Sequence, residues 1–311
     1  MDNIIKIYRN HKYNVSPVLK GGIGNNLFQI ATVYSYAWDT KKQIIIEDIF
    51  IPGFGHQSTY AGTNKDLPTR ICDIFPNINC VKGATYYWEY FECQGKDNDP
   101  NKIKHLKDTI PKNLNKVKVI GRFISTHYFD HNRDKIIELL KFSPKLLDYI
   151  KNKYKFILDK ETVSVHIRRG DFLKSIKNGK KHWCLLNTDY YENAFKIFQN
   201  KNCEYVFFAE DEESRNWIKN KLVPLISKSK YTIIQGESAP SDLCFMSLCK
   251  HNIIANSTFS IWGAYLNTYK DRIILAPSVW KKDDNIDSMS IKYRVPYNWT
   301  IIDCACRFDY L

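Results

Sequence analysis

Residues 162–171 read Thr-Val-Ser-Val-His-Ile-Arg-Arg-Gly-Asp, and the fold class follows from this stretch and its surroundings. Its β-branched and apolar side chains predict a strand over residues 162–167. Further along, similar runs alternate with helical patterns. We expect strands at residues 205–208, 231–234, 252–255 and 272–275, and helices at residues 188–199, 212–221, 241–249 and 259–268. This alternation predicts an α/β fold, with a parallel sheet covered by helices on both faces and ligands at the carboxyl ends of its strands.

The first half of the chain shows the same alternation less regularly. Strands are expected at residues 15–20, 43–47 and 116–123, with an apolar helix at 25–38, while the polar stretch 94–115 predicts an excursion between elements. We place a domain boundary near residue 160. The chain is therefore expected to form an N-terminal α/β lobe, residues 1–160, and a C-terminal lobe, residues 161–311.

The composition is that of a globular protein with an excess of positive charge. Hydrophobic residues make up 44% and charged residues 25% of the 311 positions, so the chain can bury a core. A net charge of +13 attracts anions such as nucleotides, nucleic acid or acidic membranes. The lysines are scattered, which favours a solubilising surface for most of them, and no nucleic-acid-binding module is recognisable. We expect no nucleic-acid partner, whereas peripheral binding to an anionic membrane and the oligomeric state stay open.

Nine cysteines are present, and none forms a convincing zinc-binding set. Cys304 and Cys306 are too close for an ordinary Cys-X-X-Cys pair, and Cys72, Cys80 and Cys93 lack paired neighbours. We therefore expect free, mostly buried thiols in a reducing compartment. The first twenty residues hold no long apolar run, and no stretch approaches the ~18 apolar residues of a membrane span. These observations predict a soluble cytoplasmic protein without signal peptide or anchor.

A histidine and two arginines occupy the end of the predicted strand 162–167. His166, Arg168 and Arg169 suit a diphosphate, because a guanidinium binds phosphate oxygens bidentately and keeps its charge. The alternative is a surface salt-bridge cluster with Asp171. The spacing does not decide between them.

Two other turns combine the features of an anion site with those of ordinary structure. Residues 21–26, Gly-Gly-Ile-Gly-Asn-Asn, lie between a strand and a helix, where glycines admit a ligand and the helix N-terminus favours negative charge. A tight turn is the alternative. Residues 256–263, Asn-Ser-Thr-Phe-Ser-Ile-Trp-Gly, open another helix with hydroxyl groups that suit phosphate. N-capping by Ser257 or Thr258 is the alternative here, and the two roles are compatible.

Two carboxylates follow the predicted strand 205–208. Glu210 or Asp211 can accept two hydrogen bonds from the N1–H and N2–H edge of guanine. An acidic start to the next helix, which the helix macrodipole favours, is the alternative.

In this order, the motifs resemble those of the α-1,2-fucosyltransferases that use GDP-fucose. Residues 21–29, GGIGNNLFQ, are similar to that family's GGLGNQMFQ, and residues 166–171 fit its His-X-Arg-Arg-Gly-Asp motif. The match is longest over residues 241–267, and the tail, with residues 276–277, 280 and 296–299, also fits. The resemblance runs from about residue 16 to residue 303.

The resemblance implies two Rossmann-like lobes in a glycosyltransferase B-type architecture, with the acceptor on the N-terminal side and the GDP-sugar mainly in the C-terminal lobe. It implies an inverting transfer of L-fucose from GDP-fucose to an acceptor sugar hydroxyl. No metal cofactor is expected, because Arg168, Arg169 and a helix N-terminus already supply the phosphate site. Arg168 then becomes the catalytic phosphate clamp, and Asp171 becomes a candidate general base or a brace for the arginines. Also carried over as donor-binding residues are His166 and Arg169 beside Arg168, with Gly22, Gly24, Asn25, Ser257 and Thr258 completing the phosphate cradle. Glu210, Asp211 and Asn256 are donor-binding candidates on the ground of their own positions after predicted strands.

Some positions depart from the family's pattern. Asn26, Leu27 and Ile261 replace Gln, Met and the first Trp of a Trp-Trp pair. Ala209-Glu210 stands where Ser-Asp is frequent, which bears on the guanine hypothesis. Asp97-Asn98-Asp99 has the Asp-X-Asp form of metal-dependent glycosyltransferases, but its Lys/Asn-rich surroundings favour a solvated loop.

Two other functions stay open at this point. One is a related transferase that uses another GDP-sugar or forms another linkage, and the other is a non-catalytic nucleotide- or glycan-binding relative. The acceptor pocket is expected in loops such as residues 51–65 and 88–101, from which the acceptor cannot be identified.

Overall fold

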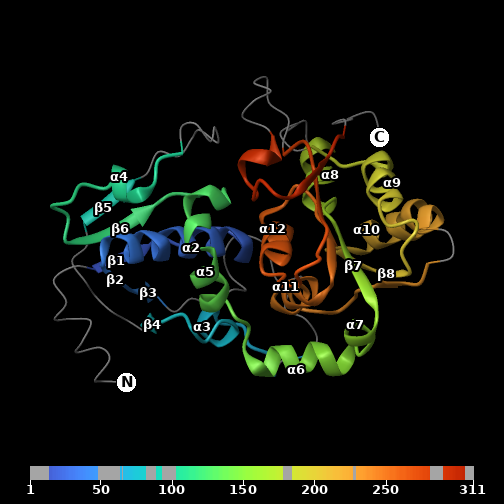
Figure 1. The fold of residues 1–311 in the computed structure, drawn as a ribbon, viewed down its shortest axis with the longest axis horizontal. Coiled ribbons are helices and arrows are strands. Elements are labelled where there is room, and N and C mark those ends of the chain that lie inside the picture. The colour runs from blue at the N-terminus through green and yellow to red at the C-terminus, as the bar shows by residue number, and fades with distance from the viewer. Residues whose placement is uncertain are drawn as a thin grey trace. The chain divides into compact units, whose positions relative to one another are not determined.

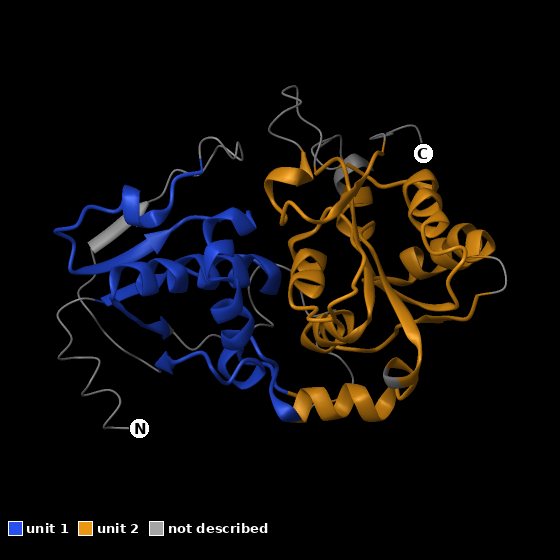
Figure 2. Ribbon diagram, in the orientation of Figure 1, with its two compact units in different colours: residues 1–57, 68–144 blue, residues 58–67, 145–311 orange. Residues whose placement is uncertain are grey.

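The computed structural model describes residues 14–47, 64, 66–81, 89–92, 103–177, 184–226, 229–280 and 290–304. The chain forms two compact units, shown in Figure 2: unit 1 comprises Met1–Gln57 and Pro68–Pro144, and unit 2 comprises Ser58–Leu67 and Lys145–Leu311. The main division thus falls earlier than the expected boundary near residue 160.

The earlier division has a physical cause in the helices α6 (Pro144–Lys153) and α7 (Phe156–Asp159), which pack on unit 2. The ring of Tyr154 lies 4.5 Å from that of Phe245, and its hydroxyl donates to the Glu237 carboxylate at 2.8 Å. Lys153 and Tyr149 also donate to Glu237, at 2.5 and 3.1 Å. This buried carboxylate fixes the end of α6 to the body of unit 2.

Unit 1 contains a parallel sheet in the strand order β2-β1-β6-β5. Its strands are β1 (Asn14–Pro17), β2 (Gln43–Ile44), β5 (Glu89–Glu92) and β6 (Lys116–Ile120). The helix α2 (Ile23–Thr40) is buried along most of its length, as its apolar sequence predicts. Shorter helical segments are α3 (Ile71–Ile74), α4 (Leu106–Thr109), η2 (Thr126–Tyr128), η3 (Asp130–Asn132) and α5 (Arg133–Leu139).

The single strand expected at residues 43–47 is divided in two. Its first part is β2, and its second part, β3 (Ile46–Glu47), leaves that sheet and pairs with β4 (Cys80–Val81). The break falls at Ile45, whose backbone N–H donates to the carbonyl of Val15 in β1.

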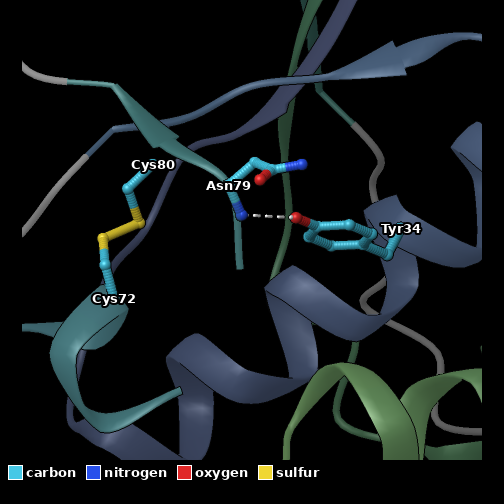
Figure 3. Close-up of a disulfide and its surroundings, with 4 residues drawn as sticks. All are labelled: Tyr34, Cys72, Asn79 and Cys80. Carbon is cyan, nitrogen blue, oxygen red and sulfur yellow. Dashed lines mark hydrogen bonds between the residues drawn. A yellow bond between two sulfur atoms is a disulfide. The ribbon is translucent and has the colours of Figure 1, made fainter. Parts of the chain in front are cut away.

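A disulfide joins Cys72 of α3 to Cys80 of β4, as Figure 3 shows. The expectation of free thiols is therefore wrong for these two residues. The turn between α3 and β4 brings their Cα atoms to 6.1 Å, within the usual range for a disulfide, and Asn79 N–H beside them donates to the Tyr34 hydroxyl. The other described cysteines form no disulfide and are buried: Cys184, Cys203, Cys244, Cys249 and Cys304. The disulfide also weakens the expectation of a reducing compartment.

Unit 2 contains a six-stranded parallel sheet in the order β12-β11-β10-β7-β8-β9, which confirms the predicted parallel sheet. Its strands are β7 (Glu161–Ile167), β8 (Cys203–Ala209), β9 (Tyr231–Ile233), β10 (His251–Ile253), β11 (Ile274–Pro277) and β12 (Thr300–Ile302). Residues 162–167 of the stretch quoted first are the fully buried body of β7, next to β8 and β10 in the middle of this sheet.

Helices cover both faces of this sheet (Figure 1). They are α8 (Gly170–Lys177), α9 (Thr188–Lys196), α10 (Glu212–Trp217) with its continuations η4 (Ile218–Leu222) and η5 (Val223–Ile226), α11 (Ala239–Leu248), α12 (Thr258–Tyr265) and η7 (Ile291–Tyr293). Val163 and Val165 belong to a core cluster with Tyr190 of α9. On the other face, Phe208 of β8 packs against Phe245 of α11. The alternation of side chains along β7 and β8 thus supplies two cores.

The long stretch 241–267 that carries the family resemblance forms one packed unit. A Cβ at Gly263 of α12 would come within 2.8 Å of the Met246 side chain, so glycine permits the close approach of α11 and α12. Asn267 donates to the Cys249 carbonyl and to Asn252 Oδ1, and Asn252 donates to Ser164 of β7. Along the described parts of both units, we find no helix long and apolar enough to span a bilayer.

Candidate functional site

Arg168 and Glu210 leave the sheet side by side at the carboxyl ends of β7 and β8. The last register pair of these strands is Ile167 with Ala209, so the next two residues project from adjacent strand ends. The Arg168 guanidinium donates to Glu210 Oε2 at 2.5 Å and, through its other terminal nitrogen, to Asp171 Oδ2 at 2.7 Å. The salt-bridge cluster that the sequence left open is therefore present, and it includes a second carboxylate.

The cluster is largely shielded from water. The side chains of Arg168 and Glu210 are 18% and 17% exposed, and that of Asp171 is 34% exposed. The Phe172 ring lies 5.6 Å from the guanidinium carbon. Ion pairs in such surroundings are screened less than surface pairs, so Arg168 is held in a defined position at the edge of the sheet where α/β folds bind ligands.

Gly170 makes room for the loop that carries Glu210 and Asp211. A Cβ at this position would overlap the Asp211 carboxylate and lie 3.8 Å from Glu210 Oε2. Asp211 in turn caps α10, since its Oδ1 accepts from the Ser214 backbone N–H at 2.7 Å. Asp211 is thus the acidic start of a helix, which was the alternative to guanine binding.

Arg169 does not join the cluster around Arg168. Its guanidinium stacks on Trp217 of α10, 4.1 Å from the ring centroid, and burial lowers the pKa of the group. This contact attaches the end of β7 to α10.

His166 is buried and neutral. Burial, followed by the charge of Arg168, lowers the pKa of its imidazole to about 3. The ring packs 5.6 Å from that of Phe259 at the start of α12, and its Nδ1 has no hydrogen-bond partner among the described residues. His166 can therefore present a neutral imidazole to a ligand, but not a positive charge.

In the turn before α12, the N-cap that the sequence allowed beside a phosphate site is present. The Ser257 hydroxyl accepts from the Phe259 backbone N–H and caps the helix. The Asn256 side chain donates to the carbonyls of Cys184 and Trp280, at 2.8 and 2.7 Å, and so joins three segments. Ser257 and Thr258 are partly exposed and can still contact a ligand.

The glycine turn predicted to cradle phosphate lies in unit 1. Gly21 has a φ of +91°, and a Cβ there would lie 2.5 Å from the Asn25 side-chain nitrogen, whereas a Cβ at Gly22 would face open space. Gly22 precedes α2, Gly24 is buried in its first turn, and Asn25 is partly exposed.

Gln29 braces this turn, a role that the sequence did not assign. Its amide accepts from the Lys20 N–H at 2.9 Å and donates to the Gly121 carbonyl at 3.1 Å, so it connects the ends of β1 and β6. A polar residue within the apolar helix 25–38 was the available signal.

Sequence reasoning also missed Asp242, in the first turn of α11. Its side chain is buried, with 8% of the residue exposed, and its Oδ1 has no hydrogen-bond partner in the described part of the protein. Burial, and then the charge of Glu237, raises the pKa of this carboxyl well above its usual range. An acidic residue in an otherwise apolar helix was the signal.

Residues 96–303 match Glycosyl transferase family 11. The chain belongs to this family. It is therefore a glycosyltransferase, and the family expected from the motifs is confirmed.

Two relatives and one solved structure illustrate the similarity of this family 11 glycosyltransferase to known proteins. An α-1,2-colitosyltransferase of Escherichia coli is 26% identical over 296 residues, covering 92% of this chain and 97% of the relative. The galactoside 2-α-L-fucosyltransferase Sec1 of Mus musculus is 23% identical over 271 residues, covering 83% and 65%. A crystal structure of NodZ α-1,6-fucosyltransferase co-crystallized with GDP shares the fold, with a TM-score of 0.51 at 14% identity, and the alignment covers 82% of this chain and 92% of NodZ.

One group of potential metal ligands lies at the amino ends of the unit 2 strands, the edge opposite Arg168. Glu161, Cys203 and His251 place their ligand atoms within 4.8 Å of one another. His251 Nδ1 accepts from the Ile273 backbone N–H, so Nε2 carries the ring proton and donates to Glu161 at 2.8 Å. Two lysines also pair with this carboxylate. The cluster is thus satisfied without an ion and is not suited to a metal of this glycosyltransferase. Asp97-Asn98-Asp99 lies outside the described residues.

Proposed function

We propose that this glycosyltransferase binds a GDP-sugar through unit 2 and transfers L-fucose to an acceptor sugar hydroxyl, forming an α-1,2 linkage with inversion. The observation that carries the proposal is the mostly buried Arg168 at the carboxyl end of β7. The names of the two relatives support an α-1,2 linkage, and one names fucose. Two units with parallel sheets support a B-type architecture, with the acceptor on the side of unit 1.

In this reaction the acceptor oxygen attacks the anomeric carbon while the bond to the β-phosphate oxygen breaks. GDP departs with the bonding electrons, and the hydroxyl proton passes to a base. Negative charge grows on the β-phosphate, where the fixed charge of Arg168 stabilises the transition state more than the ground state. Asp171 lies beside Arg168, and its ion pair favours the role of a brace over that of the base.

Three carboxylates are candidates for guanine recognition. The sequence suggested Glu210 or Asp211, but the first pairs with Arg168 and the second caps α10. Asp242 has a buried oxygen without a partner, and guanine N1–H and N2–H would supply donors for it. Asp242→Asn is expected to weaken GDP binding and to narrow the preference for GDP over ADP. Unchanged affinities would assign the recognition to another residue.

The identity of the sugar has one specific alternative. Colitose, named in one relative, is fucose without the 3-hydroxyl group. A site that hydrogen-bonds this hydroxyl rejects the analogue lacking it by a large factor, whereas a site built for the deoxy sugar discriminates weakly. The kcat/KM values for GDP-fucose and GDP-colitose therefore distinguish the two donors.

The transfer is also proposed to need no divalent metal, because Arg168 supplies charge for the diphosphate. Activity in excess chelator tests this point. Loss of activity that Mg²⁺ or Mn²⁺ restores would contradict it.

A thermal-shift panel of GDP, ADP and UDP tests the proposed donor class. At about 100 times its Kd, a nucleotide that binds only the folded protein adds roughly 2.7 kcal/mol to stability. We expect this shift with GDP and a smaller one with ADP or UDP at equal concentration. Equal shifts, or none with GDP, would contradict a GDP-sugar donor.

A further inference from the structure

The Arg168–Glu210 contact is part of the architecture of the sheet. Because Ile167 and Ala209 form the last register pair of β7 and β8, the two charged residues that follow them are neighbours by position. The missing side chain at Gly170 lets the loop with Glu210 and Asp211 approach. At 2.5 Å and more than four-fifths buried on both sides, the ion pair is a built feature of the strand ends.

This contact creates a conflict for an anionic ligand. Glu210 takes one terminal nitrogen of Arg168 and Asp171 the other, so one positive charge faces two negative charges. A diphosphate brought to the same guanidinium would meet two carboxylates and be repelled by both. For a phosphate oxygen to take the position on the guanidinium that Glu210 or Asp171 now holds, that carboxylate must give up its contact.

Glu210 is the carboxylate free to move. Asp171 lies three residues after Arg168, in the first turn of α8, and its short side chain keeps it near the guanidinium. Glu210 belongs to neither β8 nor α10, and its longer side chain has more rotatable bonds. Turning about those bonds removes its charge from Arg168 without moving the backbone.

We propose that Glu210 is a built-in substitute for the donor's phosphate. It pairs with Arg168 before the donor binds, yields that position to a phosphate oxygen of the nucleoside diphosphate, and returns as GDP leaves. This exchange keeps Arg168 oriented between turnovers and speeds release of the product. The inference rests on the proposed GDP-sugar function and adds a switch at the same site.

The test is the affinity of the full-length protein for GDP and for inorganic pyrophosphate, measured by calorimetry in the wild type and in Glu210→Gln. Removing the competing charge is expected to lower both dissociation constants by about tenfold or more, since a hydrogen bond to a charged group is of that strength. GDP release should slow by a similar factor, and product inhibition by GDP should strengthen. Glu212 is an exposed carboxylate nearby that pairs with Arg215, so Glu212→Gln is the matched control. It removes the same charge and should change these constants by less than about twofold.

A double variant isolates the contact. In an Arg168→Ala background, Glu210→Gln should no longer tighten GDP binding beyond that small electrostatic change. An undiminished gain in that background would show that Glu210 acts by general charge and would overturn the exchange. Should Glu210→Gln fail to fold, Glu210→Asp, whose shorter side chain holds Arg168 less well, is expected to tighten GDP binding by a smaller factor.

Other outcomes overturn the proposal in identifiable ways. Weaker GDP binding with the GDP-over-ADP preference retained would mean that Glu210 only positions Arg168. Weaker binding with a narrowed preference would mean that Glu210 contacts guanine. Unchanged binding would mean that the pair stays intact in the complex. If the wild type binds no GDP, the proposed function itself fails. If the wild type binds GDP and the Glu210→Gln variant binds it no more tightly, only the exchange fails.

Discussion

Arg168 is a charged residue held at the end of a buried strand by two carboxylates and an aromatic ring. If its charge stabilises departing GDP, Arg168→Ala should lower kcat by on the order of 10²–10³, by analogy with the loss of one oxyanion donor. The donor KM should change less. Arg168→Lys should recover only part of the activity, because a point charge cannot reproduce the two-nitrogen fork.

The same substitution will also lower stability, since it leaves Glu210 and Asp171 facing each other without a counter-charge. Melting temperature and kcat must therefore be measured on one preparation. A kcat per folded molecule close to that of the wild type, together with a lowered melting temperature, would reduce Arg168 to a structural ion pair.

His166 predicts a dependence of stability on acid. Its folded-state pKa of about 3 lies below the ordinary value of 6.5, so the unfolded chain takes up the proton first. The stability that the neutral ring contributes is complete above pH 6.5 and is lost as the pH falls toward 3. Between pH 7.5 and 5.5 this group should cost on the order of 1 kcal/mol in the free energy of unfolding.

His166→Gln provides the comparison, because it removes the titration and keeps a polar side chain. Asp242, whose raised pKa has the opposite effect on stability, is present in both proteins, so the difference between the two pH profiles isolates His166. Parallel profiles from pH 7.5 to 5.5 would show that the imidazole is not kept neutral.

At the scale of the elements, Gly170 and Gly22 make a matched pair of glycines at strand–helix turns. Gly170→Ala should destabilise unit 2 and weaken GDP binding, because the added methyl overlaps the Asp211 carboxylate that caps α10. Gly22→Ala, whose methyl faces open space at a φ of −73°, should leave stability almost unchanged. Denaturant unfolding and GDP titration of both variants check this, and equal stabilities for the two would contradict the packing argument.

Most helices and strands of unit 2 could be predicted closely because each buried strand interrupts a helical pattern, whereas α8 and β12 were not expected. Expected strands such as 162–167 and 231–234 agree with β7 and β9 to within one or two residues. At two places the sequence allowed either a phosphate site or an ordinary structural contact. The structure contains the structural contact at both: Arg168 forms an ion pair with Asp171, and Ser257 caps a helix. A cap and an ion pair use the same residue types as a phosphate site, so local sequence could not separate them.

Other features depend on contacts between distant segments and had no local signal. Arg169 stacks on Trp217, which lies 48 positions further along the chain. Arg168 and Arg169 are adjacent arginines after the same strand, so the local sequence did not distinguish them. Arg294 is only 2% exposed and lies over the Trp280 ring. The backbone carbonyl of Trp280 accepts a hydrogen bond from the Asn256 side chain. The place where α6 joins unit 2 depends on Glu237, some 80 residues beyond it.

At the scale of the whole molecule, the disulfide gives unit 1 a constraint that unit 2 does not have in its described residues. Because Cys72 and Cys80 close a short loop, their disulfide should contribute roughly 2–3 kcal/mol to the stability of unit 1. Reduction, or Cys72→Ser with Cys80→Ser, should lower the melting transition of unit 1 and leave the GDP-induced shift intact. Identical unfolding with and without reductant would contradict this contribution.

The measurement that tests the central claim most directly is transfer from GDP-fucose to a panel of glycan acceptors, with the product linkage determined by NMR. We expect GDP and a fucosylated glycan in equal amounts, an α-1,2 linkage, and no product from ADP- or UDP-linked sugars. A folded protein that binds GDP but transfers no sugar from any GDP donor to a panel of galactosides and other glycan acceptors would contradict the proposed function, as would a β-linked product.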